Sequence, residues 1–208
     1  MLKKLKHLLL NIRACDFSMR HGAHHLIPVI GFVAYSGTGK TTLIEGLIGH
    51  LVEFGYKVAV IKHTHHHFDI DQQGKDSYRH REAGASEVLL VSDQRWVLMH
   101  ELKELTEPTI EEQLQKISPC DLVIVEGFKA ANIPKIELWR SEHEPCKAKP
   151  LRANSDEQIV AIAYPGGVQA TNKPQLRKNI KILNLDDVQE IANYILLISG
   201  LEKDNFTS

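Results

Sequence analysis

The sequence predicts an α/β fold in three layers, in which helices cover both faces of a mostly parallel, twisted sheet. Residues 27–34 form an apolar run with β-branched side chains, which is typical of a buried parallel strand. Residues 40–54 carry apolar side chains at helical spacing, and residues 57–62 form a second apolar run. Strand, glycine turn, helix and strand together make a βαβ unit, which is right-handed by strong preference.

The rest of the chain continues this alternation of strands and helices, which favours a parallel sheet covered on its two faces. Helices are predicted at residues 76–83, 109–117 and 187–198, and strands at residues 87–92, 95–100, 121–126, 135–140, 158–163 and 179–183. Residues 141–157 are polar, contain two prolines, and are predicted to form a surface loop.

Length and composition indicate one folded domain. The 208 residues suffice for one sizeable α/β core and are few for two. We therefore expect a single domain at residues 28–200 and a short tail at residues 201–208. Residues 1–27 are rich in lysine and arginine, and we expect them to form a disordered or peripheral extension.

The overall charge and the cysteines argue against several classes of protein. A formal net charge of −1 gives no indication of a nucleic-acid or membrane partner. No apolar run approaches the roughly 18 residues that a membrane-spanning helix needs. The three cysteines are widely spaced without a C-x-x-C pair, which fits a reducing cytoplasm and indicates neither disulfides nor a thiolate zinc site.

Residues 34–42 read Ala-Tyr-Ser-Gly-Thr-Gly-Lys-Thr-Thr and nearly match the phosphate-binding pattern G-x-x-x-x-G-K-[ST]. Gly37 and Gly39 allow backbone N–H groups to converge on an anion at a helix N-terminus. Lys40 can reach the β- and γ-phosphates, and the Thr41 hydroxyl can bind Mg²⁺. Ala34 replaces the first glycine, and we expect it to be tolerated because an ordinary negative φ suffices there. The predicted nucleotide-binding residues are Ser36, Gly37, Thr38, Gly39, Lys40, Thr41 and Thr42.

Three acidic residues are predicted to complete the site. Glu126 ends an apolar strand, at the edge where ligands of open α/β sheets bind, so it can hold Mg²⁺ or its water. Asp69 and Asp71 follow the second strand, and in an extended chain they point the same way. The predicted catalytic residues are Lys40, Asp69 and Glu126, and the predicted metal-binding residues are Thr41, Asp69, Asp71 and Glu126.

These segments, taken in order, resemble one known family. They are the strand and phosphate-binding loop at residues 28–43, Lys-His-Thr-His-His at residues 62–66, Gly-Lys-Asp-Ser at residues 74–77 and Val-Glu-Gly-Phe-Lys at residues 125–129. In combination they resemble the molybdopterin-guanine dinucleotide biosynthesis protein B (MobB) family. The resemblance covers about residues 28–140 and continues more weakly to about residue 198.

The resemblance implies a GTP-binding accessory protein with weak GTPase activity, which uses Mg²⁺ and forms a homodimer in the cytoplasm. It implies a partner, the MobA-like molybdopterin guanylyltransferase, which joins GMP to molybdopterin in molybdenum cofactor biosynthesis. It also implies that Lys129 and the histidine loop at residues 63–67 lie near the nucleotide. Residues 171–175 resemble the guanine-reading motif N-K-x-D but lack its aspartate, so the choice of GTP rests on the resemblance alone.

Two other functions remain open from the residues. A small-molecule kinase would use the same phosphate-binding loop, with Arg79 and Arg81 closing over the phosphates and Asp69 near the acceptor hydroxyl. A metal-binding chaperone would use the histidines at positions 63 and 65–67, although no cysteine supports such a site. With Lys75, the same two arginines are also candidate anion contacts for a GTPase.

Overall fold

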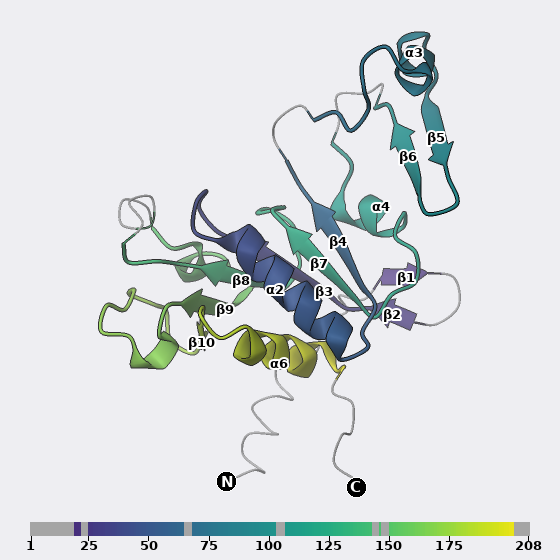
Figure 1. Ribbon diagram of the computed structural model, residues 1–208. Helices are drawn as coiled ribbons and strands as arrows, with labels where there is room; N and C mark the ends of the chain where they lie inside the picture. Colours follow the sequence, from purple (N-terminus) through teal and green to yellow (C-terminus); the bar gives the residue numbers. More distant parts are fainter. Residues whose placement is uncertain are drawn as a thin grey trace, which may run out of the picture. The chain divides into compact units, whose positions relative to one another are not determined.

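The computed structural model describes residues 19–21, 25–64, 68–102, 107–142, 146 and 150–201. Contacts between Cα atoms divide the chain into two compact units. The first unit takes its residues from Met1–His63 and Ile110–Ser208, and the second unit is Thr64–Thr109. Figure 1 shows a central sheet with helices in the first unit, and a helix with a two-stranded sheet in the second.

A parallel sheet forms the centre of the first unit (Figure 1). Its six strands lie in the order β10-β9-β8-β3-β7-β4, and every neighbouring pair is parallel. The strands are β3 (Val29–Val33), β4 (Val58–Lys62), β7 (Leu122–Glu126), β8 (Lys135–Leu138), β9 (Ile159–Tyr164) and β10 (Lys181–Asn184). The predicted mostly parallel sheet is confirmed, and the carboxyl ends of all its strands meet at one edge.

Helices cover both faces of this sheet with their apolar sides. The described α-helices that pack on the sheet are α2 (Lys40–Glu53), α4 (Ile110–Leu114) and α6 (Val188–Ser199). Helices α2 and α6 pack on one face, against strand residues that include Phe32 and Ile124. Helix α4 packs on the other face, against Val123 and Val125. Strand β7 is buried at every position because its residues alternate between these two cores. The predicted three-layer fold is therefore confirmed.

A short antiparallel pair precedes the sheet. Strand β1 (Met19–His21) pairs with β2 (His25–Ile27). The side chain of Ile27 is buried and belongs to the same core as α4. The fold thus includes at least the last residue of the predicted extension, whose first 18 residues lie outside the described part of the chain.

The prediction of a surface loop at residues 141–157 is wrong near its end. A 3₁₀ helix, η1 (Arg152–Asn154), forms there, and Ala153 is fully buried. The cause is Glu137 of β8, whose buried carboxylate accepts hydrogen bonds from the backbone N–H groups of Arg152 (3.1 Å) and Ala153 (2.7 Å). Burial raises the pKa of Glu137. This carboxylate fixes the segment against the sheet although its composition is that of a loop. A second 3₁₀ helix, η2 (Gly167–Gln169), follows β9.

An arginine holds the second unit together. This unit contains α3 (Asp76–Glu82) and two antiparallel strands, β5 (Glu87–Val91) and β6 (Trp96–His100). Arg81 donates from Nη2 to Asp69 (2.8 Å), from Nε to Asp71 (3.2 Å) and from Nη1 to Glu101 (2.9 Å). The hydroxyl of Ser77 donates to Asp71 at 2.7 Å. Helix α3 is thereby tied to the segment before it and to the residue after β6.

This network makes the second unit sensitive to acid. Hydrogen bonds from the backbone N–H of Asp71 and from Arg81 lower the pKa of Asp69 below its ordinary value of 3.8. The hydrogen bonds from Ser77 and Arg81 lower the pKa of Asp71 in the same way. Because both values are lowered, the charged carboxylates stabilise the folded unit above pH 3.8, and this contribution is lost as the pH falls below that value.

We expect amide hydrogen exchange to report this dependence. Protection factors across α3, β5 and β6 should decrease below pH 3.8 in the natural protein. Arg81→Met should lower the protection at neutral pH and weaken its dependence on acid. The matched control is Arg79→Met, because Arg79 lies on the same helix with its side chain 74% exposed. Equal loss of protection in both variants would contradict the role given to Arg81.

Candidate functional site

A glycine-rich loop joins β3 to α2 at the carboxyl edge of the parallel sheet (Figure 1). Gly37 (φ 82°) and Gly39 (φ 96°) adopt left-handed conformations, which favour glycine. Gly39 is the N-cap of α2, and Lys40 is the first residue of this 14-residue helix. Backbone N–H groups of such a turn at a helix N-terminus form a binding site for phosphate. Ala34 does not adopt a positive φ, so its backbone conformation does not require glycine.

The predicted loop residues differ in their exposure to solvent. The exposed ones are Ser36, Gly37, Thr41 and Thr42. Thr38 is buried, and its hydroxyl donates to the carbonyl oxygen of Tyr35 at 2.8 Å. The same hydroxyl lies 3.8 Å from Sγ of Cys146. The side chain of Thr38 therefore supports the loop from inside, and only its backbone is available to a ligand.

Lys40 and Glu126 meet beside this loop. Nζ of Lys40 donates to Oε1 of Glu126 at 2.6 Å, and the hydroxyl of Thr41 donates to the same oxygen at 3.2 Å. Lys62 ends β4 directly opposite Glu126 in the parallel register, with its Nζ 3.6 Å from Oε2. Glu126 is only 7% exposed. The carboxylate thus lies between the ammonium groups of Lys40 and Lys62, at the edge of the sheet where β3, β7 and β4 end.

The surroundings of Glu126 keep its carboxylate charged. Burial alone would raise the pKa of Glu126, but the hydrogen bond and charge of Lys40, the charge of Lys62 and the hydrogen bond from Thr41 outweigh it. The pKa therefore lies below its ordinary value. A charged carboxylate beside a hydroxyl supplies the hard oxygen ligands that Mg²⁺ prefers. Thr41 and Glu126 consequently fit a magnesium site next to the phosphate-binding loop.

The Lys-His-Thr-His-His motif and the Val-Glu-Gly-Phe-Lys motif pack against each other next to Glu126. The backbone N–H of His63 donates to the carbonyl oxygen of Glu126 at 2.8 Å, and the His63 ring lies 4.5 Å from the ring of Phe128. Gly127 has a φ of 100°, and a Cβ added there would stand 3.0 Å from the Cβ of His63. Glycine is required at this position for both reasons. The motifs are neighbours because β4 and β7 pair.

The other predicted site residues belong to the second unit. The carboxylates of Asp69 and Asp71 both bind Arg81 there. Their role as metal ligands, and that of Asp69 in catalysis, stays a prediction. Of the histidine loop, residues 65–67 lie outside the described part of the chain. Within the described residues, no group of three or more His, Cys, Asp or Glu side chains is arranged to hold a metal ion.

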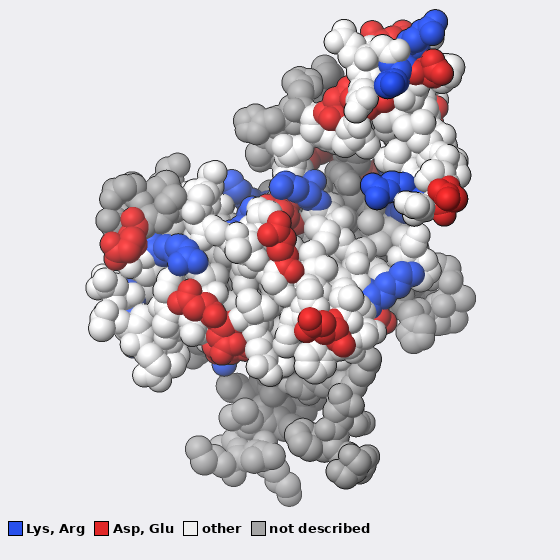
Figure 2. All heavy atoms as spheres, viewed as in Figure 1, with Lys and Arg blue, Asp and Glu red and all other residues white. Residues whose placement is uncertain are grey.

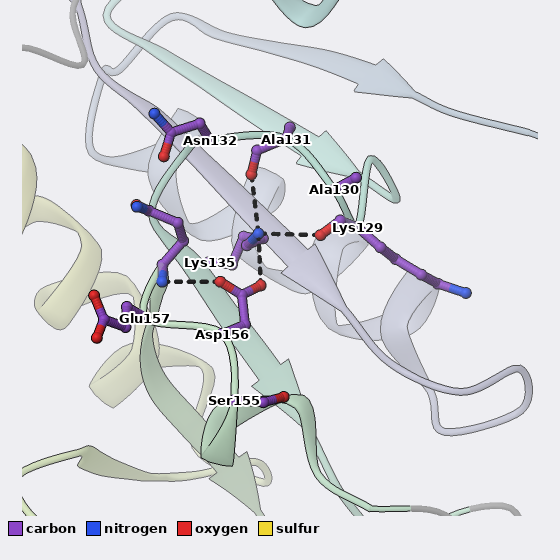
Figure 3. A pocket seen from close by; sticks show the side chains of 9 residues that line it. Lys129, Ala130, Ala131, Asn132, Lys135, Ser155, Asp156 and Glu157 are labelled. Atoms are coloured by element: carbon purple, nitrogen blue, oxygen red, sulfur yellow. Dashed lines mark hydrogen bonds and ion pairs between the residues drawn. The ribbon is translucent and has the colours of Figure 1, made fainter.

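A second polar cluster, which the sequence did not predict, surrounds Lys135 at the start of β8 (Figure 3). Lys135 is buried, and its Nζ donates to the carbonyl oxygens of Lys129 (3.1 Å) and Ala131 (2.9 Å) and lies 2.8 Å from Oδ2 of Asp156. These residues line a pocket of about 360 Å³, and the side chain of Lys129 points away from Lys135 (Figure 3). An ammonium group has three hydrogens, so these partners leave Lys135 no donor for a ligand. We interpret the cluster as structural.

Charged side chains of both signs are interspersed on the face that Figure 2 shows. This distribution agrees with a formal net charge of −1. Within the described residues, the helices are too short or too polar to cross a lipid bilayer.

The fold and the site together define a class of protein. A glycine-rich loop leads from a parallel strand into a helix that begins with Lys40. The neighbouring strand ends in the buried carboxylate of Glu126, in contact with that lysine. This combination on a parallel, helix-covered sheet is that of a P-loop nucleotide-binding protein.

Comparison with known proteins identifies the family. The sequence model of MobB, molybdopterin guanine dinucleotide synthesis protein B, matches residues 29–165. The chain is 42% identical over 170 residues to the molybdopterin-guanine dinucleotide biosynthesis adapter protein of Haemophilus influenzae, covering 81% of this chain and 88% of that protein. It is 36% identical over 182 residues to the molybdopterin-guanine dinucleotide biosynthesis adapter protein of Escherichia coli, covering 86% of this chain and 97% of that protein. The chain belongs to the MobB family, which confirms the resemblance.

The fold agrees with solved structures of the same family. The crystal structure of Bacillus subtilis MobB is similar, with a TM-score of 0.58 and 26% sequence identity. The similarity covers 86% of this chain and 100% of that chain. The parallel sheet described above is therefore the fold of MobB proteins.

Proposed function

We propose that this protein is a GTP-binding accessory protein that assists the attachment of GMP to molybdopterin in molybdenum cofactor biosynthesis. The proposal depends on one observation above all: Lys40 contacts Glu126 beside the phosphate-binding loop. A lysine, a hydroxyl and a carboxylate at this point can receive the phosphates and Mg²⁺ of a nucleoside triphosphate. The relatives from H. influenzae and E. coli, both named as adapter proteins of molybdopterin-guanine dinucleotide biosynthesis, support the biosynthetic role.

Each residue of the site has a proposed role. The backbone of residues 36–42 and the ammonium of Lys40 bind the phosphates, and Thr41 and Glu126 hold Mg²⁺. When bound, this ion offsets the negative charge of the β- and γ-phosphates. Asp69 and Asp71 remain proposed contributors from the second unit. We propose weak GTPase activity, with further groups supplied by a partner or a second copy of the chain.

The proposed partner is a MobA-like molybdopterin guanylyltransferase in the cytoplasm. The test is to measure nucleotide hydrolysis by the purified protein without any acceptor, and its binding to the purified guanylyltransferase with and without GTP. We expect slow turnover that prefers GTP over ATP, and a complex with the guanylyltransferase. ATP consumption that requires an acceptor would instead establish a kinase. Stoichiometric zinc or nickel that is lost when the histidines at 65–67 become alanine would establish a metal chaperone.

We propose that the protein is a homodimer in which the two-stranded sheet of the second unit is covered by a second copy. The register pairs Leu89 with Leu98 and Val91 with Trp96, so these four side chains share one face. They are 46–70% exposed. A two-stranded sheet is marginally stable in water, and an apolar face on it favours association.

Sedimentation equilibrium measures the oligomeric state directly. We expect the natural protein to have twice the 23.5 kDa mass of one chain. Introducing charges with Val91→Glu and Leu98→Lys should shift it towards the monomer, whereas Arg95→Gln in the connecting turn should not. A natural protein that is monomeric at micromolar concentration would refute the dimer.

A further inference from the structure

Arg140 lies against the phosphate-binding loop, although it follows a different strand. It comes two residues after the end of β8, which is the neighbour of β3 on the side away from β7. Its Nε donates to the carbonyl oxygen of Thr38 at 2.9 Å. A Cβ added at Gly39 would stand 3.6 Å from its Nη2. The guanidinium group is therefore held at the glycine next to Lys40.

Among the residues that the structure describes, only Thr38 accepts a hydrogen bond from this guanidinium group, which leaves its Nη donors for a ligand. Among the described residues, Arg140 has its hydrogen bond to Thr38 and no carboxylate partner within ion-pair distance. Arg81, by contrast, binds three carboxylates in the second unit. A partly buried arginine whose Nη donors have no partner in the described part of the chain, and which lies beside an anion-binding loop, is suited to bind a phosphate.

The order of the strands indicates which phosphate of the nucleotide Arg140 contacts. Glu126 and Thr41 place the magnesium site, and with it the β- and γ-phosphates, on the β7 side of the loop. Lys40 contacts Glu126 and serves the same two phosphates. The α-phosphate then has no cation from these residues. Arg140 supplies a positive charge on the opposite, β8 side of the loop.

We propose that Arg140 binds the α-phosphate of the nucleotide, and that the nucleoside lies over the carboxyl ends of β8, β9 and β10. This inference rests on the proposed binding of GTP. GDP carries the same α-phosphate, so Arg140 serves both nucleotides equally. The contact with Arg140 also determines how the nucleotide lies along the sheet edge. The γ-phosphate lies towards Glu126, and the base lies on the side of β10.

The test compares the binding of GTP and GDP by the full-length natural protein, Arg140→Gln and Arg140→Lys, with Lys178→Gln as control. Lys178 is exposed and precedes β10, on the amino side of that strand. We expect Arg140→Gln to weaken both nucleotides by the same factor, roughly tenfold, because one charge-assisted contact is lost. The control variant should bind both nucleotides as the natural protein does.

A second measurement separates contact with the phosphate from support of the loop. The two diastereomers of GDP with sulfur at the α-phosphate place sulfur at different non-bridging positions. If Arg140 contacts an α-phosphate oxygen, the ratio of their affinities changes in Arg140→Gln. If Arg140 only braces Thr38, both affinities fall by one factor and the ratio stays constant. Arg140→Lys keeps the charge and a donor for Thr38 but changes the geometry of its contact with a phosphate oxygen, so a changed ratio in this variant supports the contact if Arg140→Gln does not fold.

The outcomes distinguish the assignment of Arg140 from the proposed binding of GTP. Equal weakening of GTP and GDP together with a changed diastereomer ratio supports the assignment of Arg140. Unchanged affinities, weakening of GTP alone, or an unchanged ratio would overturn it while leaving GTP binding intact. If the natural protein binds neither nucleotide, the proposed function fails, and this inference fails with it.

Discussion

Replacing Lys40 with alanine is expected to weaken GTP binding at least about tenfold, because charge-assisted contacts contribute on the order of 1.5–3 kcal/mol each. The structure adds a second reason. Lys40 is paired with the buried carboxylate of Glu126 at 2.6 Å, and in the variant Lys62, at 3.6 Å, is the one cation that the described residues still place beside that negative charge. The carboxylate would then repel the incoming phosphates more strongly. Equilibrium titration with a fluorescent GTP analogue measures the loss.

The matched control for this experiment is Lys181→Ala. Lys181 is exposed and begins β10, so it lies at the amino edge of the same sheet, opposite the phosphate-binding loop. Its removal changes the net charge by the same amount and should leave the affinity unchanged. Thermal melting of both variants establishes that the fold is retained. An affinity for GTP that survives Lys40→Ala would rule out the loop as the nucleotide site.

Local patterns were sufficient to predict which residues meet at the centre of the candidate site. The strand, the glycine loop and the helix at residues 27–54 are consecutive, and the chemistry of each is visible in the residue types. Glu126 was predicted from its place at the end of an apolar strand, because parallel strands bring their carboxyl ends to one edge. The contact of Glu126 with Lys40 follows from that topology.

Hydrogen-bond and ion-pair partners that come from distant segments of the chain could not be predicted from the sequence. Residues 135–138 alternate charged and apolar side chains, a pattern typical of a strand with one polar face. Lys135 and Glu137 are nevertheless buried, because carbonyl oxygens, N–H groups and a carboxylate from other segments satisfy them. Arg140 reaches the loop through a single carbonyl oxygen 102 positions earlier in the chain. No spacing in the sequence reports such contacts.

The acidic pair of the second unit has a partner that its spacing did not predict, while its proposed role as a metal ligand stays a prediction. Asp69 and Asp71 stand two residues apart, and this spacing suggested two ligands for one metal ion. In the structure the group that both carboxylates bind is Arg81, ten and twelve residues further on. A pair of parallel carboxylates fits a cation of either kind, so the pattern alone does not distinguish a metal from a guanidinium group.

Replacing Lys135 with methionine is expected to lower the free energy of unfolding by about 3 kcal/mol, or about 1 kcal/mol for each polar partner lost. Methionine fills nearly the same space but cannot donate to the carbonyl oxygens of Lys129 and Ala131 or pair with Asp156. The lysine stem is packed over Gly31 of β3, where a Cβ would stand 2.8 Å from Cγ of Lys135.

Urea unfolding followed by circular dichroism measures this loss, and two further variants show where it comes from. Asp156→Asn keeps a polar partner at a side chain that is 26% exposed, so it should cost only ~1 kcal/mol. Lys181→Met removes an exposed lysine and should cost nothing measurable. If Lys135→Met is as stable as the natural protein, the carbonyl oxygens must find water in the pocket of about 360 Å³, and the cluster is not structural. If Lys135→Met is destabilised no more than Asp156→Asn, the ion pair with Asp156 accounts for the whole effect. The two hydrogen bonds to carbonyl oxygens then contribute nothing to holding residues 129–131 against β8.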